Sequence, residues 1–375
     1  MFTNLLAFEI RYWLRSMMVW IFFFVIGAMI FGATSSDQIV VGAAVSNTYR
    51  NAPFVIQTYY GLIGVFTMLM ATAFVNSAAA RDFQYNAHQM VFTTPLKKFP
   101  FLMGRFTGSA LISVIPMMGV SAGVILAAYM PWIDAERWRS ISWEAHLASI
   151  VTFAIPNTFF VAAIVFCIAS LTRSTMTSFL GMLVLLVAYA VSDVFTEDID
   201  NETLSAMLDP FGIRPHAFMT KYWTVSERNN KVLWWEGLML WNRLLWLGVG
   251  SAILAFTYFR FSFAERNKKG TAAAESKEQR IEIEMPAVNY RPGSQSAWQQ
   301  LIGLFRFEFF GLIKTTSFIV LLTAALLNTV PSIIFSAKEG YGNSTHPVTY
   351  FMVEVIEGSL YAFSLLMINY YADFM

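Results

Sequence analysis

The sequence predicts an all-α, polytopic membrane protein with about eight spanning helices. Charged residues make up 13% of the 375 positions and the apolar set makes up 57%, whereas a soluble domain carries about 25% charged residues. The mean hydropathy is +0.54. The apolar runs are continuous rather than alternating, and this favours spanning helices over a β-barrel.

Eight apolar runs have the length of a membrane span, since a helix needs about 20 largely apolar residues to cross a hydrocarbon core of roughly 30 Å. The first run is not expected to be a cleaved signal peptide, because no small-residue motif of the A-x-A kind follows it. In chain order the runs cover residues 17–34, 55–79, 107–130, 148–171, 176–195, 237–259, 317–336 and 349–375.

Lysine and arginine residues set the expected orientation. With the N-terminus in the cytoplasm, the inner segments carry about twice as many of these residues as the outer segments, which is the bias of the positive-inside rule. Residues 81–106, between the second and third runs, are then cytoplasmic. Residues 196–236 form the longest outer loop, and its tryptophans are typical of a membrane interface.

Two segments that directly precede apolar runs resemble each other. Residues 4–16 read NLLAFEIRYWLRS and residues 303–315 read GLFRFEFFGLIKT, with the Phe-Glu pair at 8–9 matched by that at 307–308. Each mixes bulky apolar residues with a few charges, which suits a helix that lies in the membrane interface. The chain therefore reads as one unit of six runs followed by the start of a second unit.

The predicted division has three parts. Residues 1–263 form the first six-span unit with its N-terminal interfacial helix. Residues 264–297 form a charged, alanine-rich cytoplasmic linker in which the stretch ERNKKGTAAAESKEQRIEIEMP has no aromatic residue, a composition that favours a solvated tether. Residues 298–375 form an interfacial helix and two spans, and the repeat predicts that the second unit continues beyond residue 375.

Common sequence motifs for catalysis, nucleotide binding and metal binding are absent from the chain. The chain has no G-x-x-x-x-G-K-[ST] sequence, no H-E-x-x-H and no G-x-S-x-G, so neither nucleotide hydrolysis nor a known catalytic or metal site is expected in it. The four histidines fall in four different loops, and Cys167 is the only cysteine. The net charge of +1 offers no general attraction to nucleic acid. We expect no enzyme, cofactor or metal function from these residues.

Some polar and small residues occur in or beside the apolar runs. Glu354 and Glu357 lie three positions apart, so they share a helix face and either line a polar path or reach the outer interface. Arg243, near the outer surface, is expected to join a packing ion pair. Gly119 and Gly123 form a G-x-x-x-G pattern, which predicts the close approach of a second helix.

The cytoplasmic loop RDFQYNAHQMVFTTPLKKFPFLMGRF, residues 81–106, resembles the inner loop of ABC-2-type exporter permeases. Members of that family often show a charged start, then Thr-Thr-Pro, basic residues, and Gly-Arg or Gly-Lys before the third span. These features lie here at 81–82, 93–95, 97–98 and 104–105, although the glutamate that often opens the loop is absent. The double unit is also similar to permeases that carry a C-terminal zinc aminopeptidase-like domain, of which nothing is present here.

This resemblance implies a permease of the bacterial inner membrane whose loop docks on a separate ABC ATPase subunit. ATP would bind the partner, and the permease would move a substrate that the sequence does not identify. The alternatives are a loop that acts only as a positive-inside signal, and a membrane-anchored scaffold or enzyme. The residues assigned to docking are Arg81, Asp82, His88, Thr94, Pro95, Leu96, Lys97, Lys98 and Arg105.

Overall fold

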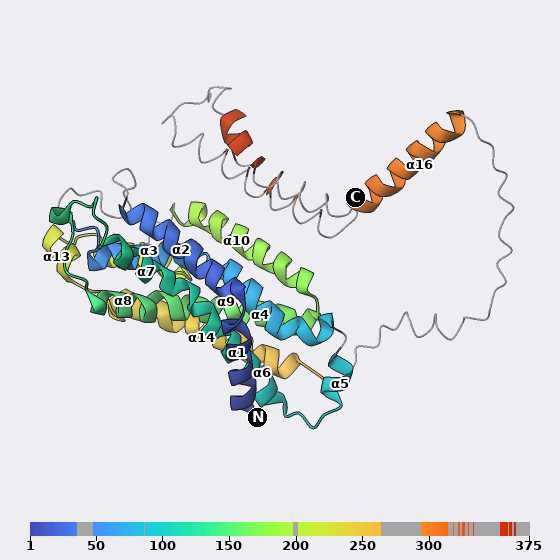
Figure 1. Cartoon of the computed structure of the whole chain (residues 1–375), viewed down its shortest axis with the longest axis horizontal. Coiled ribbons are helices and arrows are strands. Elements are labelled where there is room, and N and C mark those ends of the chain that lie inside the picture. The colour runs from blue at the N-terminus through green and yellow to red at the C-terminus, as the bar shows by residue number, and fades with distance from the viewer. Residues whose placement is uncertain are drawn as a thin grey trace. The chain divides into compact units, whose positions relative to one another are not determined.

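The structure is a computed structural model that describes residues 1–35, 48–85, 87–197, 202–263 and 294–313, together with scattered helical positions between 318 and 364. The described residues form helices and no β-strand (Figure 1). The chain divides into two units, Met1–Phe261 and Ser262–Met375. The prediction of an all-α fold is therefore confirmed for the described residues.

Four helical stretches in the described residues are long and apolar enough to cross a membrane. The first is α2 (Met17–Ser35), and the last is α14 (Gly237–Arg260). Between them, α6 (Lys98–Val114) continues through a 3-10 turn into α7 (Gly119–Ala127), and α8 (Trp143–Ser149) continues through a π-helical turn (Ile150–Ala154) into α9 (Ile155–Thr172). Irregular turns of these kinds adjust the direction of a helix without ending it.

The second predicted run forms a broken span. Helices α3 (Pro53–Gly64) and α4 (Thr67–Gln84) meet at an angle of 52°, and counted as one they bring the spans to five. At the break, the Thr67 hydroxyl donates to the Gly64 carbonyl oxygen over 2.6 Å, which satisfies a carbonyl that a continuous helix would use. The sequence run 55–79 gave no indication of this bend.

The remaining predicted runs are described only in part. Helix α10 (Thr175–Glu197) covers the fifth run, and α16 (Ser294–Ile313) includes most of the predicted interfacial segment 303–315. The seventh and eighth runs and residues 264–293 of the linker lie largely outside the described residues. The total of eight spans is therefore a prediction that these residues do not settle.

The predicted close approach at Gly119 and Gly123 is confirmed. Both glycines face α2, where a Cβ atom on Gly123 would lie 2.5 Å from the Gly27 carbonyl oxygen and 2.9 Å from the Phe31 amide nitrogen. Since both neighbouring atoms belong to the backbone, a side chain at position 123 would force the two helices apart. Small residues at such a crossing allow extensive van der Waals contact between spans.

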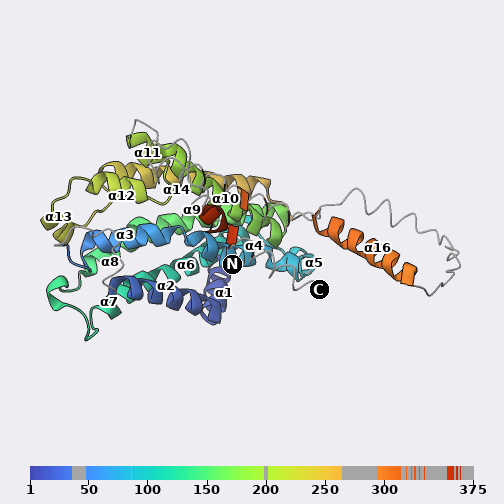
Figure 2. The ribbon, with the colours of Figure 1, turned by 90° about the horizontal axis from the view of Figure 1, so that it is seen from above.

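The long loop between α10 and α14 folds into a helical lobe, which we define as residues 202–236. It contains α11 (Glu202–Leu208), α12 (Ile213–Thr220) and α13 (Val225–Asn230). Helices α11 and α12 pack against α14 (Figure 2). The buried Gln57 side chain of α3 also binds the lobe through two hydrogen bonds. Its Nε2 donates to the Leu233 carbonyl oxygen at 2.6 Å, and its Oε1 accepts from the Leu233 backbone N–H at 3.1 Å.

Arg243 of α14 links the lobe to the spans. Its guanidinium is fully buried and donates to the Asn157 side-chain oxygen at 2.8 Å and to the Pro210 carbonyl oxygen at 3.3 Å. An ion pair was expected for this residue, whereas its hydrogen bonds go to amide and carbonyl oxygens. Buried arginine is tolerated when its five donors find acceptors in this way.

Candidate docking loop and the polar cluster beneath it

The loop segment, defined here as residues 87–97, joins α4 to α6 through the short helix α5 (His88–Phe92). Figure 1 shows α5 next to the end of α4. The Thr93 and Thr94 hydroxyls donate back to the carbonyl oxygens of Met90 and Val91 at 2.8 and 2.6 Å. Pro95 follows and has no amide hydrogen with which to continue the helix. Helix α5 therefore ends after five residues.

Large apolar side chains are exposed on and beside this segment. Met90 is 78% exposed, Tyr85 76% and Phe99 59%. Thr94, Pro95 and Lys97 are also exposed, while His88, Leu96 and Lys98 are half-buried. An apolar surface rimmed by charge is typical of a site that contacts another protein or a membrane.

The opposite side of the loop segment is anchored by aromatic rings. Phe92 lies against Phe83 of α4 at a centroid separation of 5.7 Å and against Phe101 of α6 at 6.1 Å. His88 lies 5.1 Å from the Phe83 ring. The Lys98 ammonium sits 4.8 Å from the centre of the Tyr258 ring on α14. Edge-to-face aromatic pairs of this kind add about 0.5–1.5 kcal/mol beyond burial, so the segment has a firm base.

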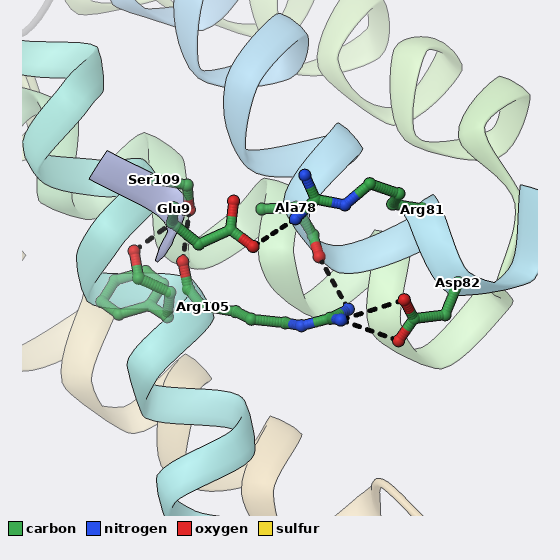
Figure 3. A network of polar contacts seen from close by, with 7 residues as sticks. Glu9, Ala78, Arg81, Asp82, Arg105 and Ser109 are labelled. Atoms are coloured by element: carbon green, nitrogen blue, oxygen red, sulfur yellow. Dashed lines mark hydrogen bonds and ion pairs between the residues drawn. The ribbon is translucent and has the colours of Figure 1, made fainter. Parts of the chain in front are cut away.

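The structure separates the predicted docking residues into two groups. Thr94, Pro95 and Lys97 lie at the exposed tip, but Asp82 and Arg105 are buried beneath it. The Arg105 guanidinium pairs with both Asp82 carboxylate oxygens at 2.8–2.9 Å and donates to the Ala78 carbonyl oxygen at 3.1 Å (Figure 3). This pair joins α6 to α4 and supports the loop without being offered to a partner.

Arg81 forms a second ion pair, with Glu9 of α1 (Phe2–Leu14), and Figure 3 shows the two pairs side by side. The Arg81 guanidinium also lies over the Tyr12 ring at 4.6 Å and over the Phe8 ring at 5.3 Å. The Glu9 side chain is completely buried. Burial raises the pKa of the Glu9 carboxyl above its ordinary value, while the positive charges of Arg81 and Arg105 act in the opposite direction.

Sequence reasoning assigned no role to Glu9, although a usable signal was present. Gly104 and Gly108 form a second G-x-x-x-G pattern, and α1 lies on it: a Cβ atom at Gly108 would be 2.7 Å from the Glu9 Cβ atom. A Cβ atom at Gly104 would be 2.9 Å from the Leu5 Cβ atom. These two glycines allow the charged side of α1 to come close to α6.

Glu354 and Glu357 lie in a helical stretch, residues 353–358, and both side chains are exposed. They belong to the second unit. Their shared helix agrees with the spacing argument. Their role as a polar path or as interface acids stays a prediction.

Two of the histidines are buried within the first unit. His146 Nδ1 lies 2.9 Å from the Ser121 hydroxyl oxygen, which lies 2.7 Å from the Tyr60 hydroxyl oxygen. His216 of the lobe stacks on Phe54 at 5.4 Å, and burial lowers its pKa to about 4. The described residues contain no group of three histidine, cysteine or acidic side chains placed to hold a metal ion.

No family model and no curated protein matches the chain. The structure itself defines a helical membrane protein whose first unit presents a short, exposed loop above paired charges and packed aromatic rings.

Proposed function

We propose that this chain is the membrane-spanning permease subunit of an ABC exporter and that its loop segment docks on a separate ATPase subunit. The observation that carries the proposal is the exposure of Tyr85, Met90 and Lys97, on and beside the loop segment, above the buried Arg105–Asp82 pair. The likeness of residues 81–106 to the inner loops of ABC-2-type permeases supports it. In this arrangement, six spans form the first unit and a second unit begins after the linker.

A docking element that transmits force has two requirements, and the loop segment meets both. Its surface must adhere to a soluble partner, and exposed Met and Tyr side chains provide apolar contact area that water covers poorly. Its base must resist bending, and the Phe92 contacts together with the Arg105–Asp82 pair tie it to two spans. A loop that acts only as a positive-inside signal requires neither feature.

Energy for transport would come from the partner, because this chain has no phosphate-binding loop. Closure of paired ATPase subunits on ATP would move the loop segment, and the spans would follow. The N-terminus and the loop would face the cytoplasm of a bacterial cell, with the helical lobe on the other side of the inner membrane. The substrate is unidentified.

The test uses the full chain, purified in mild detergent from its native membrane. Co-purifying proteins are identified by mass spectrometry, and the expected partner contains a G-x-x-x-x-G-K-[ST] motif. Met90→Asp and Lys97→Glu should each reduce its recovery about tenfold, which corresponds to about 1.4 kcal/mol of binding free energy. Lys97 is the better charge reversal, since Lys98 also contacts Tyr258 and its replacement would disturb the base of the loop.

Tyr129→Asp is the matched control. Tyr129 is 71% exposed in the turn after α7, so the substitution introduces the same charge on an exposed apolar residue remote from the loop. Recovery of the ATPase with this variant should equal that of the wild type. Equal recovery with Met90→Asp and Lys97→Glu would place docking elsewhere. The absence of any such ATPase from wild-type preparations would exclude the permease assignment in favour of an anchored scaffold or enzyme.

A further inference from the structure

We infer that the Glu9–Arg81 ion pair is a strap through which movement of the loop segment reaches α1 and then the first span, α2. This inference rests on the proposed function, because it assumes that a partner moves the loop. It assigns positioning roles to two residues, one of which lies far from the loop in the sequence.

First, Arg81 occupies the last turn of α4, directly before the loop segment begins. Any rotation or tilt of the loop therefore acts on the backbone that carries this guanidinium. The neighbouring Asp82 is fixed to Arg105 of α6. The ends of α4 and α6 beneath the loop are thus joined and are expected to move together.

Second, Arg81 holds α1 from two directions. Its guanidinium pairs with the Glu9 carboxylate and covers the rings of Phe8 and Tyr12, one residue before Glu9 and three residues after it. A cation held simultaneously by a carboxylate and two rings cannot slide along α1 without losing contacts. A displacement of α4 should therefore move α1 by nearly the same amount.

Third, the chemistry of the pair is poorly suited to stability alone. Glu9 is fully buried, and among the described residues its Oε2 atom and the Arg81 Nη1 atom have no hydrogen-bond partner. Buried ion pairs with unsatisfied atoms commonly contribute less stability than apolar side chains of the same size. An apolar contact, however, would not fix the register between α1 and α4. A role in fixing the register between α1 and α4 therefore explains the buried Glu9–Arg81 pair better than a role in packing does.

Fourth, α1 is directly connected to a span. Only Arg15 and Ser16 separate its end at Leu14 from the start of α2 at Met17. Near that end, Trp13 is buried and meets Phe74 of α4 edge to face at a ring separation of 4.9 Å. Movement of α1 consequently acts on α2, which packs on α7 through the glycine contact described above.

The test measures movement at both ends of the strap by pulsed electron paramagnetic resonance. The background is Cys167→Ser, and a reference spin label is attached through Tyr222→Cys in the lobe. The second label is attached either through Gln89→Cys, an exposed position of α5 that is not assigned to docking, or through Ala7→Cys, on an exposed position of α1. The full chain is studied with its ATPase subunit, before and after addition of magnesium and a non-hydrolysable ATP analogue.

In the otherwise unmodified protein, the nucleotide analogue should shift both distance distributions. With Glu9→Gln, the shift at the loop label should persist and the shift at the α1 label should fall by at least half. Arg11→Gln is the control, since it removes an exposed charge from the same helix and should preserve both shifts. Arg81→Lys keeps a cation and should retain more of the α1 shift than Arg81→Gln, a rescue that loss of packing alone would not produce.

Each result decides a different question. A full α1 shift in both Glu9→Gln and Arg81→Gln, together with a normal loop shift, would overturn the strap and leave the docking proposal intact. No shift at the loop label in the unmodified protein would overturn the proposed function and the strap with it. If Glu9→Gln does not give monodisperse protein, the comparison of Arg81→Lys with Arg81→Gln decides the matter.

Discussion

The contact between α2 and α7 allows a sharp test of how the first unit is held together. We expect Gly123→Ala to destabilise it, although alanine is the better helix former. A Cβ atom at position 123 would lie 2.5 Å from the Gly27 carbonyl oxygen, 2.9 Å from the Phe31 amide nitrogen and 3.1 Å from the Ile30 Cβ atom. Ordinary contacts at a Cβ atom begin at about 3.4 Å, so the helices must separate by several tenths of an ångström.

The size of the effect follows from two opposing terms. Overpacking of a well-packed contact costs about 1–3 kcal/mol. Gly→Ala within a helix stabilises by roughly 0.5–1 kcal/mol when the new methyl group is unopposed. Gly32→Ala on α2 isolates the second term, because a Cβ atom there would meet nothing within 4 Å. Because both variants gain this second term, they should differ in unfolding free energy by the overpacking term alone, about 1–3 kcal/mol.

The assay is thermal unfolding of the purified protein in detergent, followed by tryptophan fluorescence at a fixed scan rate. At about 2–4 °C per kcal/mol for a unit of this length, the difference corresponds to roughly 2–12 °C in Tm. Gly123→Ala should melt below the wild type, and Gly32→Ala at or above it. Equal melting temperatures for the two alanine variants would show that α2 and α7 are not in the close contact on which the argument depends.

Three further predictions concern the lobe and the orientation. Because burial lowers the pKa of His216 to about 4, the folded protein binds fewer protons than the unfolded chain between pH 4 and 6.5. The lobe should lose up to about 3 kcal/mol as the pH falls through this window, and the acid sensitivity of its proteolysis should vanish in His216→Phe. Arg243→Ala should cost about 2–4 kcal/mol and speed protease cleavage between α11 and α12, whereas an unchanged rate would contradict its anchoring role. In a Cys167→Ser background, Lys97→Cys should react with impermeant thiol reagents only from the cytoplasm, and Lys231→Cys only from the other side of the membrane. Labelling of both cysteines from one side would contradict the predicted placement of the loop segment and the lobe on opposite sides.

The proposed strap and docking tip place constraints on one another. Under the proposed function, the loop segment must pass movement through its base, where four charged residues from three helices form two ion pairs. Charged residues at this depth are costly unless paired. Substitutions at the tip should therefore affect partner binding, while substitutions in the base should also affect folding.

The sequence alone was sufficient to predict the all-helical membrane class and the approximate place of the described spans. Run length and continuity determine these features, since a lipid core accepts few charges and requires every backbone group to be paired within the helix. It also predicted the close contact at Gly119 and Gly123, because small residues at that spacing expose backbone along one helix face. The pattern did not reveal which helix would fill that face, and the same spacing at Gly104 and Gly108 gave no prediction of the contact with α1.

Only the tertiary structure decided which polar side chains contact one another. Glu9 and Arg81 are 72 positions apart, and Arg243 and Asn157 are 86 positions apart. Helical periodicity says which residues of one helix share a face, but not which face of another helix lies opposite. A distant contact also lies at the bend between α3 and α4, where the Asn157 side chain packs against Gly64. Burial of the predicted docking residues Asp82 and Arg105 followed from those helix contacts, which no local pattern encodes.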